Sequence, residues 1–285
     1  MRSKPAYYFL HIPKTGGTSV RCALDQLFHP EQICPHYIWD TLARASCDEL
    51  QTYQFFRGHF LSLLEDYLNR PLIKFVLLRD PVERTLSHYA HVQRDSQHPL
   101  HHQARNQSLD EWLSDPEMIP MIQDFQTNYL IAPQVNIHEL AARLNDHPLG
   151  TLSVTIENLH NNSLSITEKL AKARAYLRGC AVIGLTDDCQ KFITDVCEVL
   201  NITQIPNITR ENIGMNRLQR PAISEQTLAR IRRLTRLDQQ LYLEVKNGII
   251  TPRQPAHFGM RIIGNLKKLY LTCVGSLRAS AHVGS

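Results

Sequence analysis

The amino-acid sequence predicts an α/β protein. Short apolar runs alternate along the chain with longer amphipathic segments, as strands alternate with the helices that connect them. Two of the apolar runs lead directly into a polar loop and then a helical segment, which is how strands of an open α/β sheet end. The 285 residues, 43% of them hydrophobic and 20% charged, suffice for a folded domain with a sizeable core.

Hydrophobic periodicity places the individual elements along the chain. The predicted strands are the short apolar runs Tyr7–Ile12, Gln54–Phe60, Leu72–Leu78, Leu152–Ile156 and Ala181–Gly184, of which Leu72–Leu78 is the strongest. The predicted helices are the amphipathic segments Val20–Phe28, Val82–Gln93, Asp110–Leu113, Met118–Leu130, Ile166–Arg178, Cys189–Leu200 and Ser224–Val245. Composition predicts a loop over Gln97–Asn106 and a polar connector over Ile202–Pro221.

The formal net charge of +4 is concentrated at the C-terminus. The first 246 residues carry 26 basic and 27 acidic residues, whereas the rest of the chain carries five basic residues and no acidic one. A near-neutral body is not a surface that coats nucleic acid, so we expect no nucleic-acid partner. We expect one domain over residues 1–247 and a basic amphipathic tail over residues 248–285. The helical spacing of Phe258–Leu277 suits either an anionic membrane surface or docking on the body.

The seven cysteines form no CxxC pair and no regular spacing, so we expect reduced thiols and no zinc or iron–sulfur site. Three histidines, His98, His101 and His102, gather in one predicted loop, but a metal site needs more ligands than these. No run of about 18 apolar residues predicts a membrane span, and no signal peptide is evident. We therefore expect a cytoplasmic protein, either without membrane contact or with its tail peripheral at the inner membrane face.

The first strand leads into a loop that has the chemistry of an anion site. Two glycines allow a tight turn and a close approach of the backbone to a ligand, and the following helix begins with free N–H groups. A lysine adds a full positive charge, but it precedes the glycines and so does not form a Walker A loop. The loop residues are Lys14, Thr15, Gly16, Gly17, Thr18 and Ser19. The alternative is a tight turn with a surface lysine.

The strand Leu72–Leu78 leads into a second such junction. Asp80 suits the N-cap and Pro81 the first helical position, so the start of the helix is well specified. Arg79 follows the strand at the edge where open α/β sheets bind ligands, and Ser87 lies two turns into the helix. Both side chains can bind a phosphate. The alternative is that Arg79 pairs with Asp80 or Glu83.

Together, the two junctions resemble sulfotransferases that use 3′-phosphoadenosine 5′-phosphosulfate (PAPS). The likeness runs from about Tyr7 to Val245. The wording Leu-Arg-Asp-Pro-Val-Glu-Arg, which begins at Leu78, is closest to the carbohydrate-modifying branch with the heparan sulfate 2-O- and 6-O-sulfotransferases. Arg57-Gly58-His59 resembles the 2-O enzymes, which carry a catalytic histidine at the position of His59. Those enzymes have a second histidine where this chain has Arg57.

The resemblance implies a P-loop-like three-layer fold with a central, mostly parallel sheet flanked by helices. It implies that Lys14, Thr15, Gly16, Gly17, Thr18 and Ser19 hold the 5′-phosphosulfate and that Arg79 and Ser87 hold the 3′-phosphate. Lys14 would stabilise charge on the leaving phosphate, and His59 would be the base, with His11 and His88 as alternatives. The reaction would move a sulfuryl group from PAPS to a hydroxyl of a saccharide, glycolipid or polysaccharide, without a metal.

Several alternatives remain open from the sequence. A kinase-like P-loop protein would need a Walker lysine and magnesium ligands, which are not evident, and an inactive scaffold that binds 3′-phosphoadenosine 5′-phosphate (PAP) would keep the fold without the chemistry. Arg84, His91 and Arg94 could face an acidic acceptor or solvent. One of Arg210, Arg217 and Arg220 could touch the nucleotide. Golgi members of the branch carry an N-terminal membrane anchor, which this sequence lacks, so we expect a bacterial-type enzyme.

Overall fold

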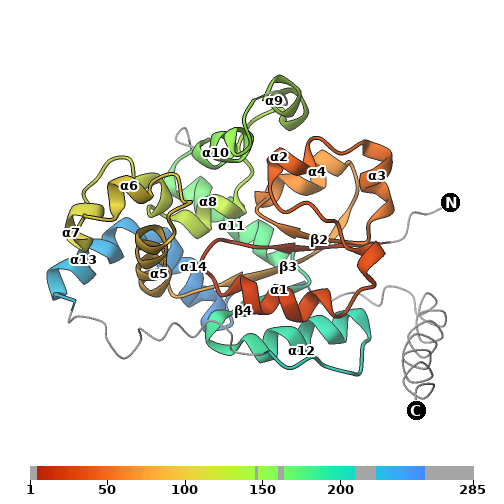
Figure 1. Cartoon of the computed structure of the whole chain (residues 1–285). Helices are drawn as coiled ribbons and strands as arrows, with labels where there is room; N and C mark the ends of the chain where they lie inside the picture. The colour runs from red at the N-terminus through yellow and green to blue at the C-terminus, as the bar shows by residue number, and fades with distance from the viewer. Residues whose placement is uncertain (1–4, 145–146, 160–163, 209–222, 254–285) are drawn as a thin grey trace, which may run out of the picture.

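The computed structural model describes residues 5–144, 147–159, 164–208 and 223–253 (Figure 1). Four parallel strands form its central sheet in the order β2-β1-β3-β4, with bounds Ala6–Leu10 (β1), Phe55–Gly58 (β2), Leu72–Leu78 (β3) and Val182–Leu185 (β4). In the shared register, Tyr8 of β1 lies opposite Phe56 of β2 and Lys74 of β3. The predicted α/β fold with a parallel sheet between helices is confirmed.

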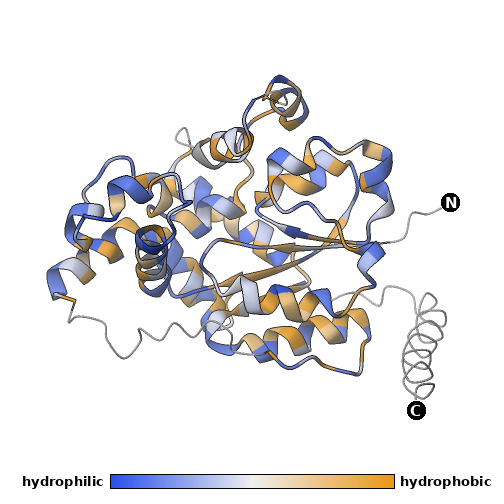
Figure 2. Cartoon of the chain, in the orientation of Figure 1, coloured by the Kyte–Doolittle hydropathy of each residue, from blue (hydrophilic) through white to orange (hydrophobic). Residues whose placement is uncertain are grey.

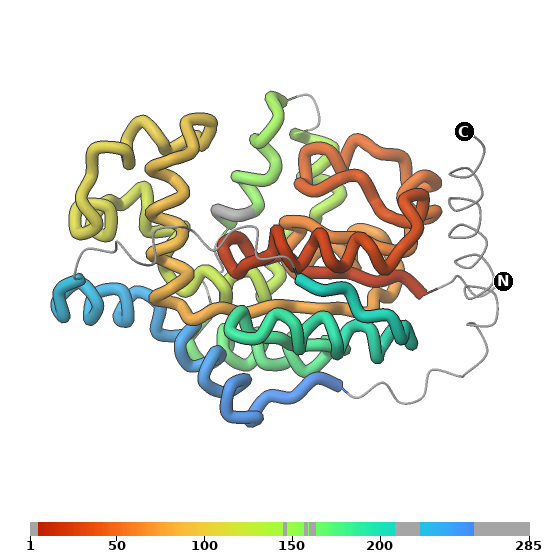
Figure 3. The backbone as a smooth tube through the Cα atoms, turned by 60° about the horizontal axis from the view of Figure 1, so that its bottom comes forward, coloured from red at the N-terminus to blue at the C-terminus, as the bar shows by residue number. Residues whose placement is uncertain are grey.

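Helices cover both faces of this sheet, because successive side chains of a strand point to opposite faces. Phe9 of β1 packs with α1 (Gly17–Asp25) and α12 (Cys189–Leu200), which run next to each other in Figures 1 and 3. Tyr8 and Leu10 face the opposite layer, which includes α8 (Phe125–Leu130), α11 (Ile166–Arg178) and α14 (Arg236–Lys246). Hydrophobic residues accordingly line the strands, α1 and α12 (Figure 2).

The remaining described helices extend the two ends of the sheet. Near β2 lie α2 (Trp39–Leu42), α3 (Cys47–Thr52) and α4 (Leu64–Leu68), and α9 (Ile137–Leu144) lies beyond them (Figure 1). On the other side, α5 (Pro81–Arg94) packs with α6 (His101–Ala104), α7 (Leu109–Trp112) and α13 (Glu225–Leu234) around a third apolar cluster. The predicted loop Gln97–Asn106 therefore contains a short helix. No helix in the described ranges is long and apolar enough to cross a membrane.

The predicted strand Leu152–Ile156 is wrong, because this segment lies within helix α10 (Thr151–Asn158). Leu152 and Ile156, four residues apart, are both buried, whereas Val154 between them is 49% exposed. A strand would point all three side chains to one face, but a helix separates the middle one. The Asp40 carboxylate accepts hydrogen bonds from the backbone N–H groups of Leu152 and Ser153, both at 3.0 Å, and so holds the start of the helix.

Two predicted long helices are each interrupted once. The segment Met118–Leu130 divides at Asp124, whose φ is +44°, into a 3₁₀ turn over Ile119–Met121 and α8. The segment Ser224–Val245 divides at Thr235 into α13 and α14. Apolar periodicity continues across both breaks, so it could not locate them.

The two interruptions lie next to each other in the fold. An aspartate from each segment caps the helix that begins after the break in the other segment. The Asp124 carboxylate accepts from the backbone N–H of Leu237 at 2.7 Å, at the start of α14. In return, the Asp238 carboxylate accepts from the N–H groups of Gln126 at 3.1 Å and Thr127 at 2.7 Å, at the start of α8. Buried N–H groups must be paired, so these reciprocal caps stabilise both breaks.

The C-terminal tail lies almost entirely outside the described residues. Helix α14 ends at Lys246, close to the expected domain boundary at residue 247. The amphipathic segment Phe258–Leu277 and the three connector arginines Arg210, Arg217 and Arg220 also lie outside the described residues. The roles proposed for them stay predictions.

We expect Asp238→Ala to lower the free energy of unfolding by about 2–3 kcal/mol, because two buried N–H groups lose their acceptor. Urea unfolding followed by circular dichroism measures the change. The matched control is Asp195→Ala, which removes the partly exposed partner of the exposed Lys191 at 2.6 Å and should cost less than about 1 kcal/mol. Equal losses in the two variants would contradict the capping role of Asp238.

The same carboxyl should make stability depend on pH. Burial and the nearby Asp124 raise the pKa of Asp238 to about 6, above the ordinary aspartate value near 4. Between these values the folded protein binds more protons than the unfolded chain, so the free energy of unfolding falls as the pH rises from about 4 to about 6. Asp238→Asn lacks this proton, so its stability should fall less over the window. If urea unfolding shows that the free energy of unfolding falls equally with pH in both proteins, Asp238 is not the source of the pH dependence.

Candidate active site

The carboxyl ends of the four parallel strands bring the sequence-predicted residues to one edge of the sheet (Figure 1). His11 follows β1, His59 follows β2, Arg79 follows β3 and Thr186 follows β4. The Thr186 hydroxyl lies 2.8 Å from the carbonyl oxygen of Thr15 and 3.0 Å from that of Leu78. It therefore connects the first loop to the end of β3.

The first loop has the backbone geometry of an anion site. Gly16 has a φ of +81°, which favours glycine, and α1 begins directly after it. A Cβ on Gly17 would lie 1.7 Å from Nε2 of His11, so the imidazole occupies the space that a side chain would need. No described side chain caps α1 and its first turn holds no acidic residue, whereas Asp80 caps α5. The N–H groups of the first turn and the helix dipole therefore favour an anion here.

Lys14 lies within a group of cationic side chains. Its backbone φ of +71° is unusual for a residue with a side chain. Burial and the positive charges of Arg94, Arg79 and Arg84 lower the pKa of Lys14 to about 8. Such a concentration of charge is compensated best by a multiply charged anion.

Arg79 supports the loop from the end of β3. Its backbone N–H donates to Oε1 of Gln126 at 2.9 Å, and its carbonyl accepts from Nε2 of Gln126 at 2.8 Å. Its guanidinium donates to the carbonyl of Lys14 at 3.0 Å and lies 3.5 Å from Glu83. The structure thus contains the expected alternative pair with Glu83 together with a direct contact to the loop.

Helix α5 presents a polar face from Ser87 onward. Ser87, His91 and Arg94 follow one another at intervals of four and three residues and so share one side of the helix. Ser87 and His91 are partly exposed, and Arg94 is exposed. Burial and then the nearby charge of Lys14 lower the pKa of His91.

Arg84 does not face solvent or an acceptor, so both sequence-based expectations for it were wrong. Its side chain is 1% exposed. The guanidinium donates to the carbonyls of Pro13 and Met121 and to Nδ1 of His88, and it lies over the ring of Phe125 at 3.7 Å. Arg84 therefore joins the first loop to the segment before α8. His88, an alternative base, is buried in the same contact.

His59 and His11 form a stacked pair with ring centroids 4.8 Å apart. Nδ1 of His59 lies 2.8 Å from the carbonyl oxygen of His11, and because a carbonyl only accepts, this nitrogen carries the proton. Nε2 of His59 is then unprotonated and can accept a proton. Burial lowers the pKa of His59 to about 4 and that of His11 well below its ordinary value, so both rings are neutral near pH 7.

Tyr37 holds this pair from outside the sheet. Its hydroxyl is hydrogen-bonded to Nδ1 of His11, and its carbonyl accepts from the backbone N–H of His59 at 2.9 Å. Its ring meets that of His59 edge-on, with centroids 4.9 Å apart. The tyrosine therefore fixes both the ring of His11 and the backbone of His59.

Arg57 lies away from the pair and has a structural role. Its guanidinium donates to Asp25 of α1 at 2.7 Å and to the carbonyl of Cys34 at 2.6 Å. In the fold, the second histidine beside His59 is His11, which comes from the neighbouring strand.

Sequence reasoning gave no role to Tyr37, Gln126 or Thr186. Gln126 and Thr186 belong to short stretches that resemble the carbohydrate branch, so a signal for them existed. Tyr37 lies in an irregular segment before α2, where neither periodicity nor a motif marks it.

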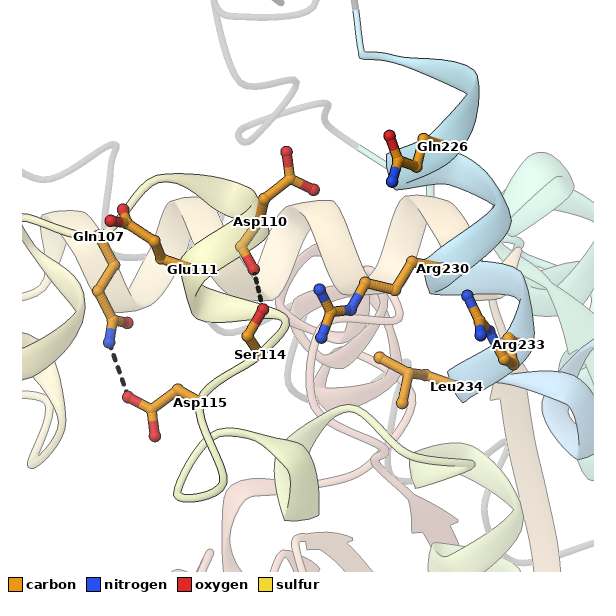
Figure 4. Close-up of a pocket in the computed structure, with 9 residues that line it drawn as sticks. All are labelled: Gln107, Asp110, Glu111, Ser114, Asp115, Gln226, Arg230, Arg233 and Leu234. Carbon is orange, nitrogen blue, oxygen red and sulfur yellow. Dashed lines mark hydrogen bonds between the residues drawn. The ribbon is translucent and has the colours of Figure 1, made fainter.

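A separate open cavity of about 1050 Å³ lies between α7 and α13, and none of the predicted site residues lines it (Figure 4). In Figure 4, Arg230 of α13 points into the space, whereas the Asp115 carboxylate is turned to Gln107. The lining residues are Gln107, Asp110, Glu111, Ser114, Asp115, Gln226, Arg230, Arg233 and Leu234. In the described part of the chain, no three His, Cys, Asp or Glu side chains are arranged to hold a metal ion.

The comparison with protein families agrees with the motifs. The model of the sulfotransferase family matches residues 3–243. Among solved structures, a sulfotransferase from Alicyclobacillus acidocaldarius is similar with a TM-score of 0.41 and 16% identity, over 82% of this chain and 96% of that chain. A search of curated proteins gives no match. Because the family match spans most of the chain and includes the first loop, Arg79 and Ser87, this protein belongs to the sulfotransferase family.

Proposed function

We propose that the protein transfers a sulfuryl group from PAPS to a hydroxyl of a saccharide or glycoconjugate. One observation carries the proposal beyond the family assignment. The uncapped start of α1, beside Lys14, packs on His11 at Gly17, and His11 stacks on the neutral His59, whose Nε2 can accept a proton. An anion site next to a base is what transfer from a phosphosulfate to a hydroxyl requires.

The cationic groups support PAPS as the donor. Lys14 and the N–H groups of Gly16, Gly17, Thr18 and Ser19 would bind the 5′-phosphosulfate at the start of α1. Arg79 and Ser87 would bind the 3′-phosphate further along the edge of the sheet. For Arg79 this requires that the guanidinium, now 3.5 Å from Glu83, also reaches the donor.

The transfer step needs only groups at this edge. Nε2 of His59 takes the proton of the acceptor hydroxyl as its oxygen attacks the sulfur. The bond between sulfur and the 5′-phosphate oxygen breaks, and its electron pair leaves with PAP, on the phosphate oxygen. Lys14 and the loop N–H groups stabilise this charge as it develops. The loop and His59 hold donor and acceptor in line, which removes much of the entropic barrier.

Two sequence features support membership in the carbohydrate-modifying branch. They are the sequence of the second motif, from Leu78 to Arg84, and Gly58-His59 at the end of β2. Arg94, which is exposed on the polar face of α5, provides positive charge that an acidic glycan could use. We place the enzyme in the cytoplasm, with a saccharide, glycolipid or polysaccharide as its acceptor. Contact of the tail with a membrane belongs to the same proposal and would suit a lipid-linked acceptor.

Incubation with ³⁵S-labelled PAPS and a panel of glycans tests the function. We expect the wild type to transfer label, and His59→Ala to lose about 100- to 10,000-fold in rate because the base is gone. PAP affinity, measured by calorimetry, should stay unchanged in His59→Ala and should weaken in Lys14→Ala.

The outcomes separate the hypotheses. Failure of the wild type to bind PAP or PAPS would sink the proposal. Tight PAP binding without transfer to any glycan would favour the inactive scaffold. Transfer that survives in His59→Ala would overturn the base assignment and leave the donor site intact. His102→Ala, which changes an exposed histidine of α6, is the matched control and should keep wild-type activity.

The pH profile of kcat/KM for PAPS should show a plateau near neutral pH, with half of the activity lost near pH 4 and near pH 8. His59 must be neutral to accept a proton and loses activity only as the pH falls towards its pKa of about 4. Lys14 must be charged to bind the donor and loses affinity as the pH rises through its pKa of about 8. Lys14→Arg stays charged, so its profile should lack the alkaline decline even if its rate is lower. An unchanged alkaline decline in Lys14→Arg would exclude Lys14 as its source.

A further inference from the structure

Arg21 is a cation with no ionic partner among the described residues. It lies on α1 one helical turn after Gly17, so it occupies the same side of the helix as the glycine that His11 packs against. The Nε atom of Arg21 is buried and has no hydrogen-bond partner. Buried polar groups are normally paired, so an unpaired guanidinium N–H calls for an explanation.

The nearest acidic residue along the helix is already engaged. Asp25 follows Arg21 by four residues, the spacing at which an ion pair forms on a helix surface. Its carboxylate instead accepts from Nε of Arg57 at 2.7 Å, and Arg57 also donates to the carbonyl of Cys34. Arg57 thus binds the carboxylate that Arg21 could have used.

Arg21 lies beside the proposed base. Its guanidinium carbon is 5.2 Å from the centroid of the Tyr37 ring, and that ring is 4.9 Å from the ring of His59. The positive charge contributes to the lowered pKa values of both His11 and His59. A contact with an aromatic face leaves the N–H donors in the guanidinium plane available for oxygen ligands.

We propose that Arg21 binds an anionic substituent of the acceptor and thereby holds the neighbouring hydroxyl at Nε2 of His59. The inference rests on the proposed function and adds to it that the acceptor carries a negative charge close to the modified hydroxyl. The ligand is a carboxylate or a sulfate ester, since the planar guanidinium binds either through paired hydrogen bonds. In the proposed function, Lys14, Arg79 and the start of α1 bind the negative charges of the donor. Arg21 lies instead near the histidines, so it is available for the acceptor.

The test compares wild type with Arg21→Gln on three oligosaccharides of one backbone. One carries carboxylates, one carries sulfate esters, and one is the carboxyl-reduced neutral form. In Arg21→Gln we expect KM for the charged oligosaccharide that Arg21 recognises to rise about 10- to 100-fold, because a charge-assisted hydrogen bond is lost. KM for the neutral oligosaccharide should stay unchanged. Arg21→Lys should recover part of the loss. KM for PAPS and the affinity for PAP should not change.

The matched control is Arg230→Gln, which removes another partly buried arginine, at the separate cavity between α7 and α13 (Figure 4). It should leave all three acceptors unaffected. A rise in KM for PAPS in Arg21→Gln would overturn the proposal in favour of a donor contact. Equal losses with charged and neutral acceptors would overturn it in favour of a role in placing Tyr37.

Calorimetry separates this inference from the proposed function. Binding of the charged oligosaccharides to the PAP-loaded protein should weaken in Arg21→Gln by the same 10- to 100-fold, whether or not label is transferred. Absence of transfer with intact, Arg21-dependent binding would contradict the catalytic proposal and leave the role of Arg21 standing. Binding of charged and neutral oligosaccharides with equal affinity to wild type would contradict the role of Arg21.

Discussion

The amide of Gln126 joins the helical layer to the site, and the geometry of the anion loop depends on it. Both its oxygen and its nitrogen bond to the backbone of Arg79, so the end of β3 is fixed in one orientation. Arg79 in turn donates to the carbonyl of Lys14, at the turn that precedes the glycines. Gln126 is itself held because its N–H is capped by the buried Asp238. One chain of hydrogen bonds thus runs from α14 through α8 to the loop after β1.

This chain explains why the late helices matter to a site made at strand ends. A parallel sheet brings the loops after its strands to one edge, but it does not fix their conformation. The loop after β1 has Lys14 at a positive φ, which costs free energy unless neighbouring groups enforce it. Arg79, Arg84 and Thr186 each bond to a carbonyl of this segment, at Lys14, Pro13 and Thr15. The surrounding helices therefore pre-organise the loop before any ligand binds.

The elements that could be predicted from the sequence are those whose signal is local. Leu72–Leu78, Ile166–Arg178 and Cys189–Leu200 have the bounds expected from apolar runs and caps, and the two junction motifs placed Lys14 and Arg79 at one edge. The predictions were wrong where a residue far away in the sequence determines where a helix begins. Asp40 caps α10 across more than a hundred residues, and Asp124 and Asp238 cap α14 and α8, which begin at breaks that periodicity does not show. The pairing of His59 with His11 follows from strand order, which a single sequence does not give.

The site also explains why net charge is a poor guide to this molecule. Its body is near neutral, yet three cations lie close enough to Lys14 to contribute to its lowered pKa. They are Arg94, Arg79 and Arg84. Assembling these charges without an anion costs free energy, which the folded core must offset. An anionic donor at the start of α1 would relieve that repulsion, so its binding and the folding of the loop favour each other. The neutral histidines complete the arrangement, because a protonated base would add to the same repulsion and could accept no proton. Burial that keeps His11 and His59 uncharged therefore serves the stability of the site and the chemistry we propose for it.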